Sequence, residues 1–330
     1  MLLNRFPRPA IFVASLLTTC VLHADVTIRY KTEFTPAPAL QPLLEQFMKT
    51  ALNGMETSVS VKDGKAFTSA GKWTEIFDFT QQQVTLLDPT HKTFAVLPAS
   101  ELADRMASAK PQANSQQMQA AQKALESITT HVDSKVTGKT EEIHGVQSEE
   151  RVVTLTMDMP MPSGASPSGP TMTMVMHIWT AKKEEAMRVP AIRELTGYRE
   201  WQKYFMNPAG MFDKLLGKMP GVGKTIGPLL SEMFKDQSVV MRTHMEIYLP
   251  MLANLAKNMA AQGKDAPAMD PHAPLLEMKQ EVAELSSATV DASLFEVPKE
   301  YTSIAADGMI RDLLANHGAQ QGAAPSPTNK

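Results

Sequence analysis

The sequence is nearly free of cysteine, and this absence excludes several classes of chemistry. Its 330 residues contain one cysteine, Cys20, which lies in an apolar segment near the amino terminus. If the chain is cleaved after Ala24, the mature protein has no thiol. Disulfide bonds, zinc–thiolate centres and cysteine nucleophiles are then excluded.

An excess of basic charge is also missing. The chain has 32 lysine and arginine residues against 35 aspartate and glutamate residues, a formal net charge of −3. Removing residues 1–24 takes away Arg5 and Arg8 and no acid, which moves the charge to −5. A mildly acidic protein without a basic stripe is not expected to bind nucleic acid.

Motifs for catalysis or for a cofactor are lacking as well. Gly221–Thr225 looks like part of a phosphate loop, but Lys218 stands where that loop needs a glycine. The histidines are scattered, and no two have the i, i+4 spacing of a helical zinc pair. No two carboxylates are placed for acid–base catalysis. The sequence therefore predicts a protein that is not an enzyme and that has no cofactor.

The first 24 residues have the pattern of a secretory signal. Two arginines precede the apolar run Ala10–Leu22, and the small residue Ala24 comes before a polar, alternating segment that starts at Asp25. The apolar run is too short and wrongly flanked for a membrane span. We expect cleavage between Ala24 and Asp25, export to the periplasm or the medium, and no transmembrane span in the mature chain. A competing interpretation attaches a lipid anchor to Cys20.

Strands dominate the rest of the chain. Residues 57–98 predict a β-meander, in which Asp63-Gly64 marks a two-residue hairpin turn because both positions favour positive φ. Further extended segments are predicted at 129–136, 140–146, 151–157, 171–179, 238–249 and 294–301, and at 276–286, which could equally be helix.

Helical segments interrupt these strands. Helical periodicity or composition is present at 100–127, 190–206 and 251–262. This order favours an α+β fold in which one antiparallel sheet, folded once, packs against inserted helices. We expect a single domain over residues 25–305 with a helical insertion near 190–235. A short helix and a disordered tail are expected over 306–330.

Methionine is unusually abundant, with 23 residues. Two trios alternate along consecutive predicted strands: Met157, Met159 and Met161, then Met172, Met174 and Met176. Successive side chains of a strand point to opposite faces, so each trio lies on one face. If the loop Pro160–Pro170 joins the two strands as a hairpin, the trios become neighbours.

Three interpretations of these methionines compete. They fill an irregular core, they form an adaptable apolar surface for a ligand, or all six thioethers bind Cu(I). Copper is the weakest of the three, because His177 points to the face opposite Met174 and Met176.

Several segments resemble an uncharacterised family of exported bacterial proteins, domain-of-unknown-function family 4412. The similar segments are Lys65–Leu97, Thr140–Arg151 leading to His177–Ala181, and Phe295–Tyr301. Such proteins resemble the lipoprotein-carrier fold, in which a curved antiparallel sheet, an incomplete β-barrel, wraps an apolar groove and helices cover its concave face. The resemblance implies a binding role rather than catalysis, with a lipid, a lipoprotein acyl chain or another hydrophobic small molecule as partner.

The favoured hypothesis is therefore an exported protein that holds a hydrophobic ligand between sheet and helices. The expected groove residues are Trp73, Phe77, Phe79, Met157, Met159, Met172, Met174 and Met176. The alternatives are a periplasmic copper-binding protein that uses the methionine-rich hairpin, and a structural envelope protein whose apolar groove is merely its core.

Overall fold

The computed structural model describes residues 25–38, 41, 56–70, 73–108, 128–158, 170–203, 238–263 and 269–312. The strands in this part of the chain are β1 (Val26–Pro36), β2 (Glu56–Lys62), β3 (Lys65–Ala70), β4 (Trp73–Asp78), β5 (Gln83–Asp88), β6 (Thr93–Pro98), β7 (Thr129–Ile143), β8 (Val146–Asp158), β9 (Met172–Ala181), β10 (Val240–Tyr248), β11 (Leu276–Ser286) and β12 (Thr302–Ser303). The helices are α2 (Ala99–Ser108), α4 (Glu185–Arg188), α5 (Pro190–Trp201) and α8 (Pro250–Ala261), and a 3-10 turn, η2, covers Ala292–Phe295.

All of these strands belong to one sheet. Their order is β12-β6-β5-β4-β3-β2-β1-β11-β10-β9-β8-β7, and the two outermost strands do not pair, so the sheet is not closed. Among the described strands, only the short pairing of β12 with β6 is parallel. The expectation of an α+β fold built on a large antiparallel sheet is confirmed at this level.

Tight turns set the strand order in the meander, β2 to β6. Asp63 and Gly64, between β2 and β3, have φ angles of 48° and 75°, the left-handed values that a two-residue hairpin turn requires. The hairpin predicted from Asp63-Gly64 is therefore confirmed. His144 and Gly145 form the same kind of turn between β7 and β8, with φ angles of 50° and 75°.

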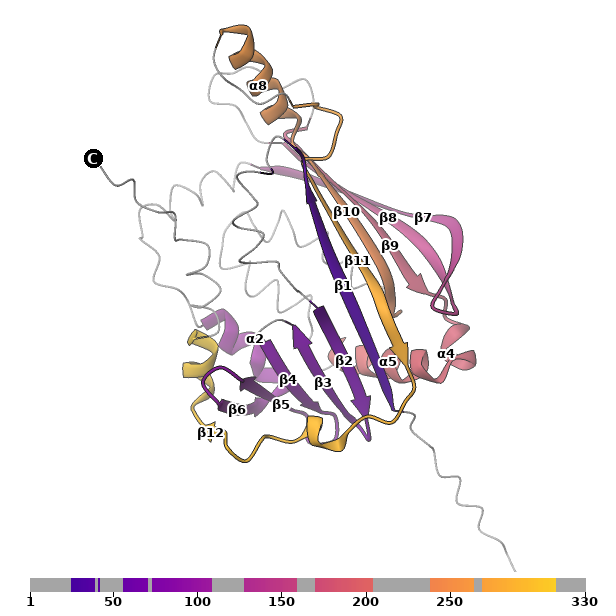
Figure 1. Cartoon of the computed structure of the whole chain (residues 1–330), viewed down its shortest axis with the longest axis vertical. Coiled ribbons are helices and arrows are strands. Elements are labelled where there is room, and N and C mark those ends of the chain that lie inside the picture. Colours follow the sequence, from indigo (N-terminus) through magenta and orange to yellow (C-terminus); the bar gives the residue numbers. More distant parts are fainter. Residues whose placement is uncertain are drawn as a thin grey trace, which may run out of the picture.

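β1 joins the meander to the other half of the sheet. Its first six residues pair with β2 on one side, and nearly its whole length pairs with β11 on the other. Residues 276–286, which from the sequence could equally be helix, are therefore a strand, held between β1 and β10. In Figure 1 the long strands β1, β11, β10, β9, β8 and β7 extend well beyond the shorter strands of the meander.

α5 covers the end of the sheet where β1 begins (Figure 1). Pro190 stands in its first turn, where a missing N–H costs little, and Ile192, Leu195 and Tyr198 recur on its buried face. These side chains belong to one core cluster with the first residues of β1 and with parts of β2 to β6. The helix predicted at 190–206 is confirmed over its described part. The rest of the predicted insertion lies outside the described residues.

The segment after β11 differs from the extended strand predicted at 294–301. The carboxylate of Asp291 accepts a hydrogen bond from the backbone N–H of Ser293 at 2.9 Å, and η2 follows. This turn buries Phe295. Asp and Ser side chains favour such local bonds over an extended backbone, which explains the difference. Beyond β12, residues 306–312 are helical, in agreement with the short helix predicted there.

Candidate functional site

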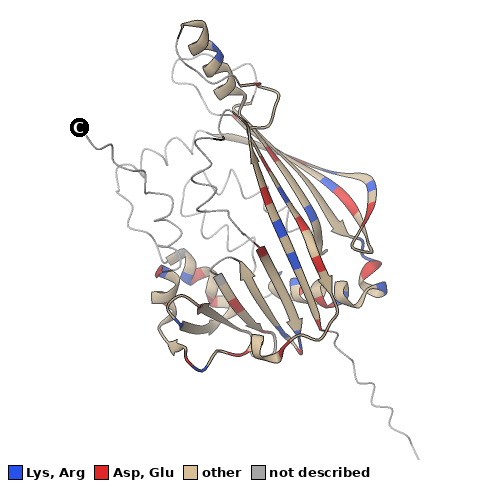
Figure 2. Cartoon of the chain, viewed as in Figure 1, with Lys and Arg blue, Asp and Glu red and all other residues tan. Residues whose placement is uncertain are grey.

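The strands β1, β11, β10, β9 and β8 have one charged face and one mostly apolar face, which the polar partners Thr32, Gln280 and Thr243 interrupt. Side chains alternate between the faces of a strand, and along β1 the even-numbered residues are the more buried ones. Figure 2 shows lysine, arginine, aspartate and glutamate interspersed along β1, β10 and β11. The two faces of the sheet are therefore chemically different surfaces.

Two rows of directly paired residues run across the apolar face. The first row is Phe34, Met278, Met245, Met176 and Val153, from β1 to β8. The second row is Pro36, Leu276, Ile247, Met174, Leu155 and Val132, from β1 to β7. Every member of both rows is apolar. The two rows, together with Met157 and Met172, are termed the methionine face.

The condition set for the methionine hairpin, antiparallel pairing of the two strands, is met. Met157 and Met172 are direct partners in the antiparallel pairing of β8 with β9. Met174 and Met176 follow on the same face, and Met176 is 3% exposed whereas the other three are half-buried. Met159 and Met161 lie outside the described residues.

The phenylalanines expected in the groove instead pack against the aromatic side chains of α5. The ring centroids of Phe77 and Trp201 are 5.7 Å apart, and Phe79 stacks on Tyr198 at 5.9 Å. Phe77 is 1% exposed, so α5 already occupies the space in front of it. Trp73 begins β4, and its side chain lies outside the described part of the chain.

The methionine face continues the surface that α5 covers. Phe34 and Pro36 have the same parity along β1 as Val26 and Ile28, so all four point to one face of the sheet. Val26 and Ile28 lie in the core cluster under α5. The structure therefore separates the expected groove residues into a part packed under α5 and a methionine part further along the same face.

The opposite, charged face contains a pocket of about 450 Å³. It is lined by Glu33, Thr35, Glu150, His177, Trp179, Arg242, His244, Glu277 and Lys279, and is termed the polar pocket. His177 and His244 are direct partners on β9 and β10, and their rings are stacked with centroids 6.1 Å apart. The predicted orientation of His177, away from Met174 and Met176, is confirmed.

Glu150 is a buried carboxylate at one wall of the polar pocket. Its side chain is 4% exposed and accepts hydrogen bonds from Nδ1 of His177 at 2.9 Å and from Oγ1 of Thr137 at 2.7 Å, while Nζ of Lys139 lies at 3.3 Å. Burial opposes its ionisation, but the bonds from His177, Thr137 and Lys139 outweigh this effect and lower the pKa of Glu150. The carboxylate is therefore ionised at neutral pH.

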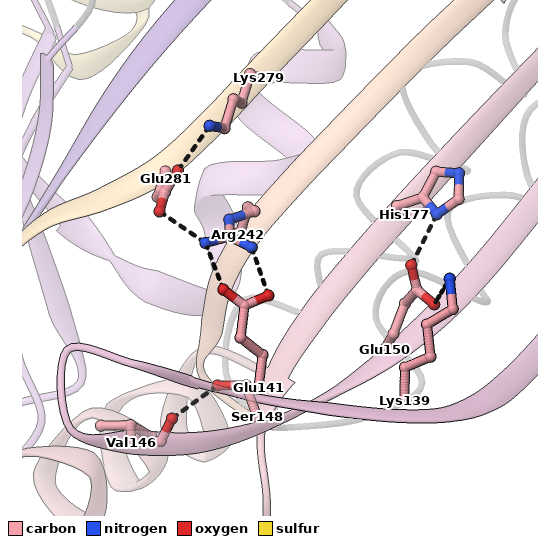
Figure 3. A network of polar contacts seen from close by, with 9 residues as sticks. All are labelled: Lys139, Glu141, Val146, Ser148, Glu150, His177, Arg242, Lys279 and Glu281. Carbon is pink, nitrogen blue, oxygen red and sulfur yellow. Dashed lines mark hydrogen bonds and ion pairs between the residues drawn. The ribbon is translucent and has the colours of Figure 1, made fainter.

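Arg242 closes the other wall (Figure 3). Its guanidinium donates to both oxygens of Glu141 at 2.9 and 3.1 Å and to Glu281 at 2.9 Å, and lies 6.0 Å from the ring centre of Trp179. The hydrogen bonds that Arg242 donates to Glu141 and Glu281 raise its pKa, so its charge is permanent.

The pairing of Arg242 with Glu141 shows how strongly the edge of the sheet is curled. Glu141 belongs to β7 and Arg242 to β10, and β8 and β9 lie between them. In a flat sheet those strands would be about 14 Å apart, three strand spacings, which is too far for a direct ion pair. A bulge in β7 between Val136 and Thr140 bends the strand there, and Figure 3 shows Glu141, on the hairpin of β7 and β8, facing Arg242.

Sequence reasoning missed the polar pocket. It treats every histidine as isolated, because β9 and β10 come from distant parts of the chain and only their pairing brings His177 next to His244. Among the described residues, no group of three or more His, Cys, Asp or Glu side chains is already arranged to hold a metal ion.

Comparison with known proteins adds no assignment. No protein-family model and no curated protein matches the chain. Within the described ranges, every helix is too short or too polar to span a bilayer.

Proposed function

We propose that this protein is exported to the periplasm or the medium and binds a hydrophobic ligand, a lipid or an acyl chain, on its methionine face. The observation that carries the proposal is the pair of apolar rows, which cross five neighbouring strands without a polar residue. In this proposal the sheet acts as an incomplete barrel of the lipoprotein-carrier kind, and the ligand lies between sheet and helices.

The chemistry of the methionine face suits such a ligand. A thioether side chain is unbranched, flexible and polarisable, so it adapts to chains of different shape. Burying an acyl chain contributes about 0.8 kcal/mol per methylene, so a short tail already gives a useful affinity. Most members of the rows are half-buried rather than buried, which leaves apolar area that a ligand can cover.

A charge on this face is expected to weaken ligand uptake. Met174 and Val175 are neighbours on β9 that point to opposite faces, so they offer a matched pair of substitutions. Met174→Lys is expected to weaken binding of an apolar fluorescent dye at least about tenfold, because the ammonium must be desolvated. Val175→Lys, on the charged face beside Glu246, is expected to leave dye binding unchanged.

Dye titration and native mass spectrometry together test the proposal. The protein purified from its own host is expected to carry a co-purifying lipid that extraction with an organic solvent removes. Absence of both lipid and dye uptake would count decisively against ligand binding. Equal dye affinity in Met174→Lys and Val175→Lys would place the ligand elsewhere.

The pairing of Met157 with Met172 favours a second function, binding of Cu(I). Soft thioethers suit this ion, and cross-strand partners bring two of them together. In this case titration with Cu(I) under reducing conditions gives saturable binding, which is lost when leucine replaces Met157, Met159, Met161, Met172, Met174 and Met176. Leucine keeps the surface apolar, so dye uptake survives this change. Equal copper affinity in the wild type and the leucine variant would exclude copper binding by these methionines.

A further inference from the structure

The polar pocket holds a histidine whose hydrogen bonding is fixed. One oxygen of the Glu150 side chain lies 2.9 Å from Nδ1 of His177, while the other oxygen accepts from Thr137 and faces Lys139, so Nδ1 is the nitrogen that donates to the carboxylate. In the neutral imidazole, this leaves the lone pair on Nε2, at the ring edge away from Glu150 (Figure 3). A carboxylate that orients a histidine in this way is typical of histidines that bind metal ions.

A second imidazole and a carboxylate lie next to that histidine. His244 is the direct partner of His177 across β9 and β10. Its Nε2 lies 3.4 Å from Oε2 of Glu277 and 3.9 Å from Oε1 of Glu246. The side chains of His177 and His244 are 31% and 34% exposed, so both rings can be reached from solvent.

The charges around the pocket favour a cation. Glu33, Glu150 and Glu277 line it, and Glu141, Glu246 and Glu281 border it, against Lys31, Lys139, Arg242 and Lys279. Six carboxylates and four cationic groups leave a net charge of −2. Arg242 is already paired twice, and its guanidinium lies over Trp179, so this ring is not free to receive an organic cation.

We propose that His177 and His244 bind one divalent transition-metal ion, of the class of Zn²⁺, Ni²⁺ or Cu²⁺, with Glu277 as a third ligand. Imidazole nitrogens prefer these ions, whereas Ca²⁺ and Mg²⁺ require oxygen ligands. Two nitrogens bound to one zinc ion at 2.0–2.1 Å are at most about 4 Å apart. The two rings are stacked with their planes 29° apart, so their in-plane lone pairs do not meet at one point, and binding involves a rotation of the more exposed ring, His244, toward Nε2 of His177. This site is independent of the methionine face.

Isothermal titration of the metal-free protein with Zn²⁺ tests the site. We expect one ion per chain, and no heat of binding from Mg²⁺ in the same buffer. His244→Ala is expected to lower the zinc affinity at least tenfold while leaving the bonds of Glu150 intact. Glu150→Gln, a change at a positioning residue, is expected to lower it by about 10–100-fold. His272→Ala changes an exposed histidine in the turn before β11 and is expected to have no effect.

The visible spectrum of bound Co²⁺ distinguishes metal ligation by the histidines from a purely structural role. Co²⁺ bound by two imidazoles and a carboxylate has visible absorption bands, which are expected to disappear in His177→Asn and in His244→Ala. Circular dichroism establishes that each variant is folded. The proposal is overturned if Zn²⁺ does not saturate the protein, or if His272→Ala loses as much affinity as His244→Ala, which is the result for adventitious surface binding. It is also overturned if folded His177→Asn keeps the cobalt bands.

Discussion

Replacing Phe77 with alanine is expected to lower the free energy of unfolding by about 3–5 kcal/mol. The side chain is 1% exposed and lies between the sheet and α5, with the rings of Tyr198 and Trp201 at centroid distances of 5.8 and 5.7 Å. The substitution removes apolar contacts and leaves a cavity that the neighbouring rings cannot fill. It also removes two aromatic pairs, each of which contributes about 0.5–1.5 kcal/mol beyond the buried area.

Urea denaturation followed by tryptophan fluorescence measures this effect. Phe77→Leu keeps most of the volume and is expected to cost less than about 1.5 kcal/mol. Val96→Ala, on β6 in the same meander, is the matched control, because Val96 is 46% exposed and its truncation is expected to change stability by less than about 0.5 kcal/mol. A loss below about 1 kcal/mol for Phe77→Ala would show that Phe77 is not part of a packed core and would return it to the ligand groove.

Phe77 also shows where prediction from the sequence ends. Strand periodicity states which residues share a face, and it correctly gives the strands and turns of the meander because those depend on neighbouring residues. It does not state what lies on that face. Tyr198 and Trp201 come from a helix more than a hundred residues later, and their packing turns an expected ligand contact into core.

The methionine face could be predicted only in part, again because sequence patterns report on neighbouring residues. Strand parity predicts that each methionine trio shares one face, and because the two strands follow one another in the chain, their pairing as a hairpin could be considered from the sequence. The extension of the rows to Met245, Met278 and Phe34 depends on the order β9-β10-β11-β1, which joins the two ends of the chain. Nothing in the local pattern of these segments indicates that order.

The polar pocket depends on distant pairing alone. Arg242 and Glu141 are 101 positions apart, and their contact requires both the order of the strands and the curl at the bulge in β7. Each charge, taken by itself, fits the solvent-exposed face of an ordinary strand. Burial distinguishes Glu150 from the others, and burial is a property of the assembled sheet.

Glu150→Gln is expected to destabilise the protein by about 1–3 kcal/mol at neutral pH. The ionised carboxylate accepts charge-assisted bonds in a site where it is 4% exposed, and the neutral amide accepts weaker ones. The amide also places an NH₂ group toward a donor, whichever way it is turned, because Nδ1 of His177 faces one oxygen of the native side chain and Nζ of Lys139 faces the other.

The difference in unfolding free energy between the wild type and Glu150→Gln is expected to shrink in acid. The pKa of Glu150 in the folded protein is lowered from its ordinary value of 4.5 by the bonds from His177, Thr137 and Lys139, which outweigh the opposing effect of burial. A lowered pKa stabilises the fold fully above the unfolded value, and this stabilisation is lost as the pH falls through the folded value. The unfolding free energies of wild type and Glu150→Gln should therefore converge below pH 4.5.

Urea titrations at a series of pH values measure this convergence. Glu284→Gln is the control, because Glu284 is 46% exposed and pairs with Arg29 at 3.4 Å on the surface. Such a pair contributes little, so this variant is expected to differ from wild type by less than about 0.5 kcal/mol at neutral pH. If Glu150→Gln is as stable as wild type at neutral pH, or if the gap widens in acid, the carboxylate is not the ionised anchor that orients His177. The metal site proposed in the polar pocket would then lose the group that fixes its first ligand.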